Sequence, residues 1–470
     1  MADGIVQNRL ISLDVFRGMT IAGMVLVNNP GTSPVYWPLE HAEWNGLTPT
    51  DWIFPFFLFI VGVAVPIALG RRIEEGVTSK VYTKIISRAA MIFGLGLAIS
   101  VLPFFQFTST NAPDWLKMAS WLALAASLLF LLLRNFKVAA ALGAVGLAVI
   151  AAMNLAGYNV VPYDFSTMRI FGVLQRIAVC YLVTSLIFLH TDWRQQVYLA
   201  IALLVGYWFV MTNIPVPGCE VTTIDDKACN LAAYIDRMVL GENHIWRFGK
   251  VYDPEGILST IPAIVTTISG VLTGTWLTKR DRHNAAEVVD RESDVPGASS
   301  REEWTATAPG TSSTVPSRSA LSKVSAIFFF GVVLFACGYV WNSFFPFNKA
   351  LWTSSYVLVT SGLALLVLGA CYWLIDIHGY RRWATPFKIF GANALALFVF
   401  SGIFARMISA YKVAFTAEGK GISAQRWSVD HIFLAAFQPV NASLAFAVSF
   451  ILFWLFLMWL LYRKDLYIKV

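Results

Sequence analysis

Long apolar runs recur along the whole chain and are separated by short polar segments. Each run has about the 20 residues that an α-helix needs to cross the roughly 30 Å hydrocarbon core of a bilayer. Helices are the expected form, because backbone groups in lipid find no water to bind. The pattern predicts twelve membrane-spanning helices, at approximately 10–30, 51–70, 84–104, 116–134, 137–157, 170–190, 195–214, 257–278, 323–345, 354–376, 386–411 and 440–462.

The composition supports this interpretation. The 470 residues are 57% hydrophobic and only 13% charged, whereas a soluble domain has about 25% charged residues. We therefore expect an all-α, polytopic membrane helix bundle whose surroundings are membrane lipid. The net charge of +7 does not indicate a nucleic-acid partner, because basic loops on one side of a membrane protein produce such an excess. The N-terminus lacks the features of a cleaved signal peptide, so the first run is expected to be retained.

Lysine and arginine gather at both ends of the chain and in the loops after every second predicted span. These residues are Arg9, Arg71, Arg72, Arg134, Lys137, Arg194, Lys279, Arg280, Arg282, Arg381, Arg382, Arg463 and Lys464. The positive-inside rule then places both termini in the cytoplasm and the loops 31–50 and 214–256 on the outward side.

One long polar segment divides the chain. Residues 279–322 are rich in Ser, Thr, Pro, Gly and charge, a composition that cannot bury enough apolar surface to fold. We expect a disordered cytoplasmic linker between a part with eight spans, residues 1–278, and a part with four spans, residues 323–470.

The cysteines and histidines show no metal-binding pattern. Cys219 and Cys229 lie in the outward loop 214–256, where an oxidising compartment favours a disulfide between them. The other three cysteines lie in apolar runs and are expected to be packing residues. The six histidines lack ligand spacing, so we predict no metal. A Walker A loop and a GxSxG elbow are also absent from the sequence.

His41 is the first candidate for chemistry. It lies in the outward loop 31–50 among Trp37, Trp44 and Trp52, which favour a position at the membrane interface. Histidine can act as a base or a nucleophile near neutral pH, and Asp51 can orient it. The alternative is a solvated surface histidine, with Asp51 as an ordinary acid of a first helical turn.

Polar residues within apolar runs are further candidates. Gln175 and Arg176 lie inside the sixth predicted span, where a charge is costly unless it faces a cavity or a partner. Asp14 and Arg17 share one helix face and form either part of a cavity or an interfacial ion pair. Asn393 lies inside the eleventh predicted span and can hydrogen-bond across helices.

Several outward residues also have two possible roles. Asn28 precedes the stop of the first span and either ends the helix or points an amide into a cavity. Asp253 and Glu255 precede the eighth span and are either first-turn acids or the rim of a substrate site. Asn348 and Lys349 lie in another outward loop.

Seven segments together resemble one known family. They are RLISLDVFRG (9–18), HAEWNGLTPTDWIFPFF (41–57), GVLQRIAVCY (172–181), PVPGC (215–219), AAYIDRMVLG (232–241), YDPEGILSTI (252–261) and FNKALWTSSYV (347–357). With these motifs in this order, the chain resembles the heparan-α-glucosaminide N-acetyltransferase of the lysosomal membrane and its bacterial relatives.

The resemblance implies an activity. The family moves an acetyl group from cytoplasmic acetyl-CoA to an amino sugar across the membrane, and its proposed active-site residue matches His41. It also implies a homodimer. The family's large lumenal domain is missing from this sequence, which argues against a heparan acceptor and for a bacterial inner membrane. Residues 116–157 resemble no family segment and are expected to be an extra helix pair.

On this basis we assign roles to the candidates. His41 either attacks the thioester or takes a proton from the acceptor amine; Asp51 orients it, and Asn28 is the expected donor to the oxyanion. The residues expected to bind the CoA moiety are Arg17, Arg71, Gln175, Arg176 and Arg382. Those expected to contact the acceptor are Trp44, Asp253, Glu255, Asn348 and Lys349.

Two other functions fit the pattern. An amino-sugar transporter would use intramembrane polar groups such as Arg176 and Asn393, without needing His41, but paired broken helices in two equivalent halves are not evident. A purely structural membrane partner is disfavoured by the intramembrane arginine.

Overall fold

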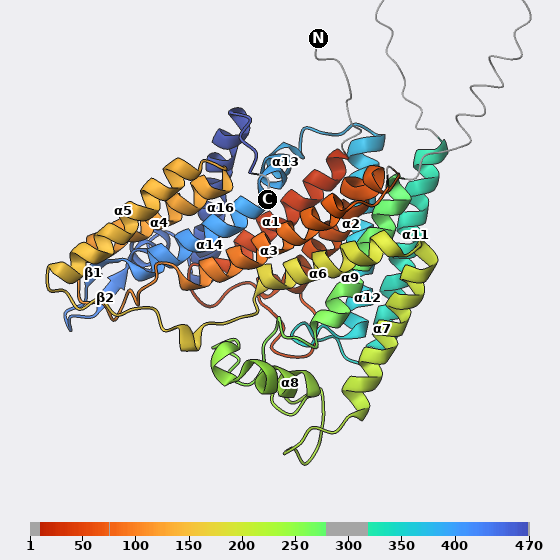
Figure 1. Cartoon of the computed structure of the whole chain (residues 1–470), viewed down its shortest axis with the longest axis horizontal. Coiled ribbons are helices and arrows are strands. Elements are labelled where there is room, and N and C mark those ends of the chain that lie inside the picture. The colour runs from red at the N-terminus through yellow and green to blue at the C-terminus, as the bar shows by residue number, and fades with distance from the viewer. Residues whose placement is uncertain (1–9, 75, 279–317, 469–470) are drawn as a thin grey trace, which may run out of the picture.

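The computed structural model describes residues 10–74, 76–278 and 318–468. Within these ranges the protein is almost entirely helical (Figure 1). Eleven of the described helices are long and apolar enough to cross a membrane. They are α1 (Ile11–Asn28), α2 (Ile53–Glu74), α3 (Ser79–Val101), α4 (Asp114–Leu132), α5 (Phe136–Leu155), α6 (Val173–His190), α7 (Trp193–Asn213), α9 (Thr260–Thr278), α11 (Arg318–Trp341), α12 (Ser354–Cys371) and α16 (Pro439–Arg463). The predicted all-α membrane bundle is confirmed.

The remaining predicted span, 386–411, is not one continuous helix. It consists of α13 (Thr385–Ala392) and α14 (Ala394–Ala410), which meet at an angle of 82°. Asn393 stands at the break with a non-helical ψ of 36°. Its side chain donates to the carbonyl of Leu466 at 3.0 Å and accepts from the amide of Ile468 at 2.8 Å. These bonds to the C-terminal segment stabilise the break, which apolar periodicity alone does not reveal.

The short helix α13 packs directly against α1. A Cβ atom added to Gly18 would lie 1.7 Å from the carbonyl oxygen of Phe387, and one added to Gly391 would lie 2.0 Å from that of Asp14. Both positions therefore require glycine for this close backbone approach.

The short elements lie between the spanning helices. They include α8 (Leu231–Leu240), α15 (Ala424–Ser428), the antiparallel strands β1 (Lys412–Phe415) and β2 (Gly421–Ser423), and the 3-10 helices η1 (Trp37–Leu39), η2 (Pro49–Trp52), η3 (Phe165–Thr167) and η4 (Glu242–His244). Two π-helical turns, η5 (Tyr372–Ile377) and η6 (Val429–Phe433), follow α12 and α15.

The loops 29–52, 156–172, 214–259, 342–353 and 411–438 gather at one end of the bundle, which we call the His41 end. They are joined by bonds such as Asn348 to Asn45, Trp44 to Ile224 and Gln425 to Pro30. Helix α8 and the β-hairpin lie at this end, the lower one in Figure 1. Both loops predicted to face outward, 31–50 and 214–256, are therefore on the same end of the molecule; the sidedness itself stays a prediction.

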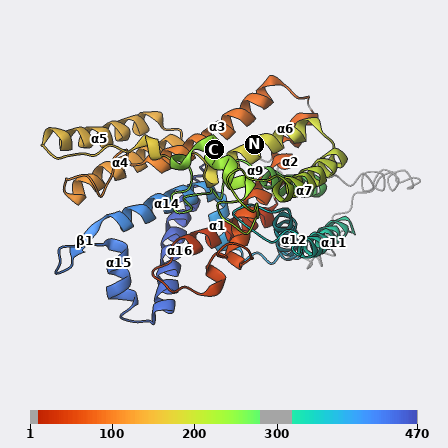
Figure 2. The same ribbon diagram turned by 90° about the horizontal axis from the view of Figure 1, so that it is seen from below.

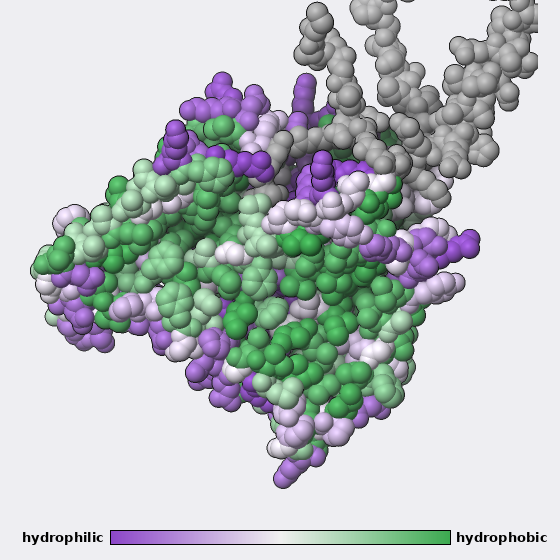
Figure 3. Space-filling view, viewed as in Figure 1, coloured by the Kyte–Doolittle hydropathy of each residue, from purple (hydrophilic) through white to green (hydrophobic). Residues whose placement is uncertain are grey.

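The surface between the two ends is apolar. Figure 3 shows a hydrophobic band across the helices, with polar residues above and below it. The helices α4 and α5 pack on each other and form a hairpin at one edge, opposite α11 (Figure 2). This hairpin corresponds to the two predicted spans 116–134 and 137–157. Of the predicted linker, residues 279–317 lie outside the described residues, whereas 318–322 belong to α11.

Candidate active site

His41, Asp51 and Lys349 meet at the His41 end. Nδ1 of His41 lies 2.7 Å from Oδ1 of Asp51. The Lys349 ammonium lies 2.9 Å from Nδ1 and 3.4 Å from Nε2 of the same imidazole, and 3.4 Å from Oδ1 of Asp51. Half of the His41 side chain is exposed, whereas only 1% of that of Asp51 is. The imidazole is thus partly accessible, while its carboxylate partner is buried.

Local backbone geometry fixes Asp51. It lies in η2, just after Pro49, where its Oδ2 accepts bonds from the amides of Ala42 at 3.2 Å and Thr48 at 3.1 Å. The hydroxyl of Thr48 lies 3.0 Å from the same oxygen and 2.6 Å from the carbonyl of Glu40, and it can donate its single proton to either. These contacts hold Oδ2 in place, and Oδ1 faces His41 and Lys349.

Lys349 is positioned by its neighbour Asn348. The fully buried Asn348 accepts a bond from the amide of Leu351 at 2.9 Å and donates to Oδ1 of Asn45 at 3.0 Å. The amide of Gly46 also donates to the carbonyl of Phe347 at 2.8 Å. Asn348, predicted to contact the acceptor, therefore uses its side chain to join two loops, and Lys349 is the group that reaches His41.

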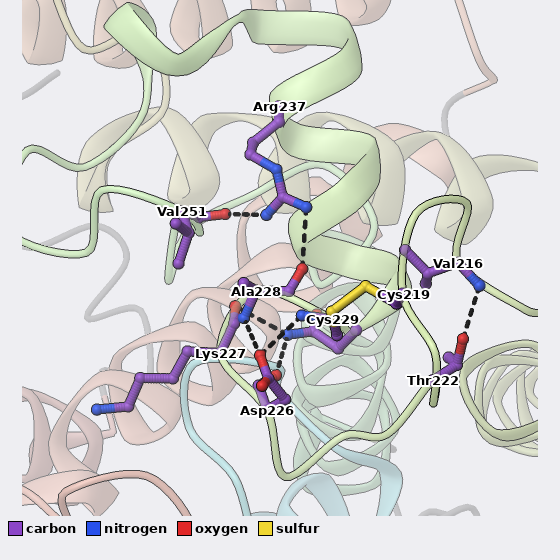
Figure 4. The surroundings of a disulfide bond; sticks show 10 residues. Val216, Cys219, Thr222, Asp226, Lys227, Ala228, Cys229, Arg237 and Val251 are labelled. Atoms are coloured by element: carbon purple, nitrogen blue, oxygen red, sulfur yellow. Dashed lines mark hydrogen bonds between the residues drawn. A yellow bond between two sulfur atoms is a disulfide. The ribbon is translucent and has the colours of Figure 1, made fainter.

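The loop 214–230 supports the same arrangement from the other side. Trp44 donates to the carbonyl of Ile224 at 2.9 Å, and its ring packs edge-on against Tyr252 with centroids 5.0 Å apart. Cys219 and Cys229 are joined by a disulfide in this loop. Arg237 of α8 bonds to the carbonyls of Ala228 and Val251, as Figure 4 shows. Trp44 thus lies at the side of the site, where the loop that it contacts is held by a disulfide and hydrogen bonds.

A second charged cluster adjoins the first. Nε of Arg169 donates to Oδ2 of Asp253 at 2.9 Å and its Nη2 donates to Oδ1 at 2.5 Å; Nη2 also contacts the carboxylate of Glu255. Burial and the neighbouring Glu255 raise the pKa of Asp253 despite its pairing with Arg169. Burial lowers the pKa of Lys349, and the carboxylates of Asp51 and Glu255 only partly oppose this change. Glu255 therefore connects the two clusters electrostatically.

Arg169 was not among the predicted site residues, although its position in the sequence carries one signal. It is a basic residue in a loop that the positive-inside rule places outward, where arginine is uncommon. Its pairing with two buried acids, Asp253 and Glu255, accounts for this position.

Asp236 and Arg176 both bond to the segment 256–259, which directly follows Glu255 of the second cluster. Asp236 of α8 accepts a bond from the amide of Ile257 at 2.8 Å, and burial raises its pKa to about 6. Arg176 is fully buried, bonds to the carbonyl of Gly256 at 3.1 Å and to the hydroxyl of Ser259, and lies 5.1 Å from the ring centroid of Trp352. Its Nε and Nη1 have no hydrogen-bond partner among the described residues. An arginine buried within an apolar helix is costly unless it is paired; its predicted role in binding the CoA moiety stays a prediction.

Four predicted site residues lie apart from these clusters. Arg17 forms an ion pair of 3.2 Å with Asp14 at the start of α1, the end of the bundle opposite His41. Arg382 is exposed between α12 and α13, and the side chain of Arg71 is outside the described structure. Asn28 is exposed at the last turn of α1, and within the described residues no hydrogen bond joins it to His41.

Gln175 contacts a different helix from its neighbour Arg176. It is buried against α3, where a Cβ atom added to Gly96 would lie 2.5 Å from its Oε1. Among the described residues, no group of three or more His, Cys, Asp or Glu could hold a metal ion.

Comparison with known proteins supports the resemblance inferred from the motifs. A family model described as heparan-α-glucosaminide N-acetyltransferase, catalytic, matches residues 9–161. This range includes the helix pair 116–157, so the expectation that the pair resembles no family segment is not supported. The chain is 28% identical over 416 residues to the heparan-α-glucosaminide N-acetyltransferase of Mus musculus, an alignment that covers 83% of this chain and 53% of that protein. For the Homo sapiens protein the identity is 27% over 420 residues, with 84% and 53% covered. The chain thus spans about half the length of the curated relatives it matches, and the predicted resemblance is confirmed.

Proposed function

Because this chain is a relative of the heparan-α-glucosaminide N-acetyltransferases, we propose that it transfers an acetyl group from acetyl-CoA to an amino sugar at the His41 end of the bundle. The observation that carries the proposal is the contact of His41 Nδ1 with the buried Asp51. A proton held on Nδ1 by the carboxylate leaves the lone pair of Nε2 available to act as a base or a nucleophile.

Two routes are compatible with this geometry. In the first, Nε2 of His41 attacks the thioester carbonyl, the C–S bond breaks, and the acetyl group is held on the imidazole until an amine attacks it. In the second, the amine attacks the thioester directly while His41 takes its proton. In both routes the amide C–N bond forms, the amine loses a proton, and CoA leaves as a thiolate that is protonated.

Lys349 is the proposed donor to the oxyanion. A developing negative charge on the carbonyl oxygen requires a fixed positive group nearby. The carbonyl that Nε2 of His41 attacks would lie next to Nε2, and the Lys349 ammonium lies 3.4 Å from that nitrogen. This assignment replaces the sequence-based role of Asn28, whose exposed side chain has no hydrogen bond to His41 in the described structure.

The acceptor amine is proposed to bind beside Glu255 and Asp253. An amino sugar arrives as an ammonium ion, and buried carboxylates favour a cation. Asp236 has a pKa of about 6 and can accept a proton near neutral pH. Arg169 prevents repulsion between the two acids it bridges.

The CoA moiety is proposed to approach from the opposite end. Its phosphates carry too much charge to cross about 30 Å of hydrocarbon without a polar path. Arg17, Arg71 and Arg382 are the proposed phosphate ligands, and Arg176 with Gln175 the lining of the path. We place the protein in a bacterial inner membrane, with both termini cytoplasmic, as a homodimer.

The test is acetyl transfer by purified protein in detergent. Wild type is expected to acetylate glucosamine from labelled acetyl-CoA, and His41→Ala to lose this activity. His431→Ala is a matched control, because His431 is an exposed histidine at the same end whose Nδ1 bonds to the backbone carbonyl of Trp427. Equal activity of wild type and His41→Ala would overturn the proposal.

A further inference from the structure

An aromatic groove lies beside the loop that carries His41. It has a volume of 260 Å³ and lies between α14, α15, η6 and α16, which stand next to one another in Figure 2. Five phenylalanines line it: Phe404, Phe433, Phe446, Phe450 and Phe453. The ring of Phe404 lies 5.9 Å from that of Phe450 and 5.2 Å from that of Phe453. The few polar side chains of the lining include Gln425 and Ser449.

The depth of the groove indicates what fills it. Phe404 lies in the second half of α14, Phe446 and Phe450 lie in the first half of α16, and Phe453 lies just past its middle. These halves lead to and from the segment 411–438 at the His41 end. The groove therefore lies in the half of the bilayer nearer His41, where an open apolar cavity faces hydrocarbon chains instead of water.

The groove is continuous with the chain that leads to His41. A Cβ atom added to Gly31 would lie 2.8 Å from Cβ of Phe446, so the backbone there lies directly on the groove wall. Gln425 donates to the carbonyl of Pro30 at 3.3 Å, and the hydroxyl of Tyr36 donates to Asn441 of α16 at 2.5 Å.

A smaller cavity lies on another side of α16. It is lined by Tyr36, Leu39 and Val440 among others, and Leu39 is two residues before His41 in the chain. Helix α16 thus lines the groove on one side and contacts the loop that carries His41 on another.

We propose that this groove binds the hydrocarbon chain of the acceptor, so that the acceptor is an amino sugar anchored in the membrane by an alkyl or acyl tail. Chain burial among aromatic rings supplies affinity, and the polar residues at the mouth let the sugar leave the groove toward His41. The inference rests on the proposed acetyltransferase function and names its substrate class.

Kinetics with two acceptors test the inference. Glucosamine and n-octyl β-glucosaminide share the amine and differ only in the tail. In the groove-filling variant Ser449→Phe, we expect the KM for octyl glucosaminide to rise on the order of tenfold, with the KM for glucosamine unchanged. Val448→Phe is the matched control, because Val448 is an exposed neighbour that does not line the groove. An equal KM for octyl glucosaminide in wild type and Ser449→Phe would overturn the inference.

Photolabelling separates the groove from the activity. An octyl glucosaminide with a diazirine at the tail end is expected to label α14 and α16 peptides in wild type, and to label them less in Ser449→Phe. Labelling elsewhere, or displacement of the label by phosphatidylglycerol but not by octyl glucosaminide, would assign the groove to bulk lipid and overturn the inference. If neither sugar is acetylated but the groove is still labelled, the acetyltransferase proposal fails and the amphiphile site stands.

Discussion

Asn348 donates a side-chain hydrogen bond of 3.0 Å to Asn45, although 303 residues separate them in the chain. This contact joins the loop before α12 to the loop before α2, and it sets Lys349 against His41. The candidate active site is therefore built at the junction of two distant segments.

Loss of this junction is expected to impair activity. Asn348→Ala removes one buried hydrogen bond, that with the amide of Leu351, and one partly buried bond to Asn45, which costs about 1–3 kcal/mol of stability. We expect kcat to fall with only a modest loss of thermal stability, as measured by acetyl transfer and by unfolding in detergent. Asn213→Ala, at the exposed end of α7, is expected to change neither; a kcat for Asn348→Ala equal to that of wild type would contradict the role of this contact.

Neutralising Asp51 is expected to reduce catalysis more strongly. Asp51→Asn keeps the size of the side chain but removes the carboxylate that faces His41 at 2.7 Å. Without it the proton on Nδ1 is no longer held, and kcat should fall on the order of 10²-fold or more. The comparison is with Asp164→Asn, which changes a carboxylate that accepts bonds from Ser166 in an exposed turn. Similar rates for the two variants would show that Asp51 does not orient the histidine.

The raised pKa of Asp236 is expected to make the free energy of unfolding depend on pH. Its pKa is about 6 in the folded protein and 3.8 in the unfolded chain, so the folded state binds the proton more tightly between these values. The free energy of unfolding should therefore rise as the pH falls from about 6 to about 4, by at most about 3 kcal/mol. Thermal unfolding of Asp236→Asn should lack this gain, while Glu242→Gln, which changes an exposed acid, should retain it. Parallel pH profiles of wild type and Asp236→Asn would refute the assignment.

Arg169 is expected to be essential to the second cluster. Arg169→Met leaves Asp253 and Glu255 buried without a counter-charge, which costs about 3–5 kcal/mol. The double variant Arg169→Met with Asp253→Asn should recover part of this loss, because the repulsion is then removed. The free energies of unfolding of wild type, Arg169→Met, Asp253→Asn and the double variant together give the coupling energy between the two side chains. Additive losses would mean that the two side chains act independently.

Local pattern was sufficient for most of the fold. Apolar runs of spanning length predicted eleven of the helices. The distribution of lysine and arginine among the loops predicted that the segments 31–50 and 214–256 lie at the same end. The bend at Asn393 was not predictable, because it depends on hydrogen bonds to Leu466 and Ile468, distant in sequence.

The site shows the same division. His41 and Asp51 are ten residues apart, so their pairing could be expected from one loop. Lys349 could be placed only in an outward loop, since its contact with His41 spans 308 residues. Arg169 could not be assigned to the site from the sequence, because a loop arginine is usually solvated and its partners Asp253 and Glu255 are more than 80 residues away.

The most direct test of the account uses sealed liposomes that contain the purified protein. Labelled acetyl-CoA is supplied on the face with the chain termini, and glucosamine on the other. We predict that label reaches the sugar with wild type and His431→Ala but not with His41→Ala. Passage of unmodified glucosamine across the membrane, unaffected by His41→Ala, would contradict the account and identify the protein as a permease.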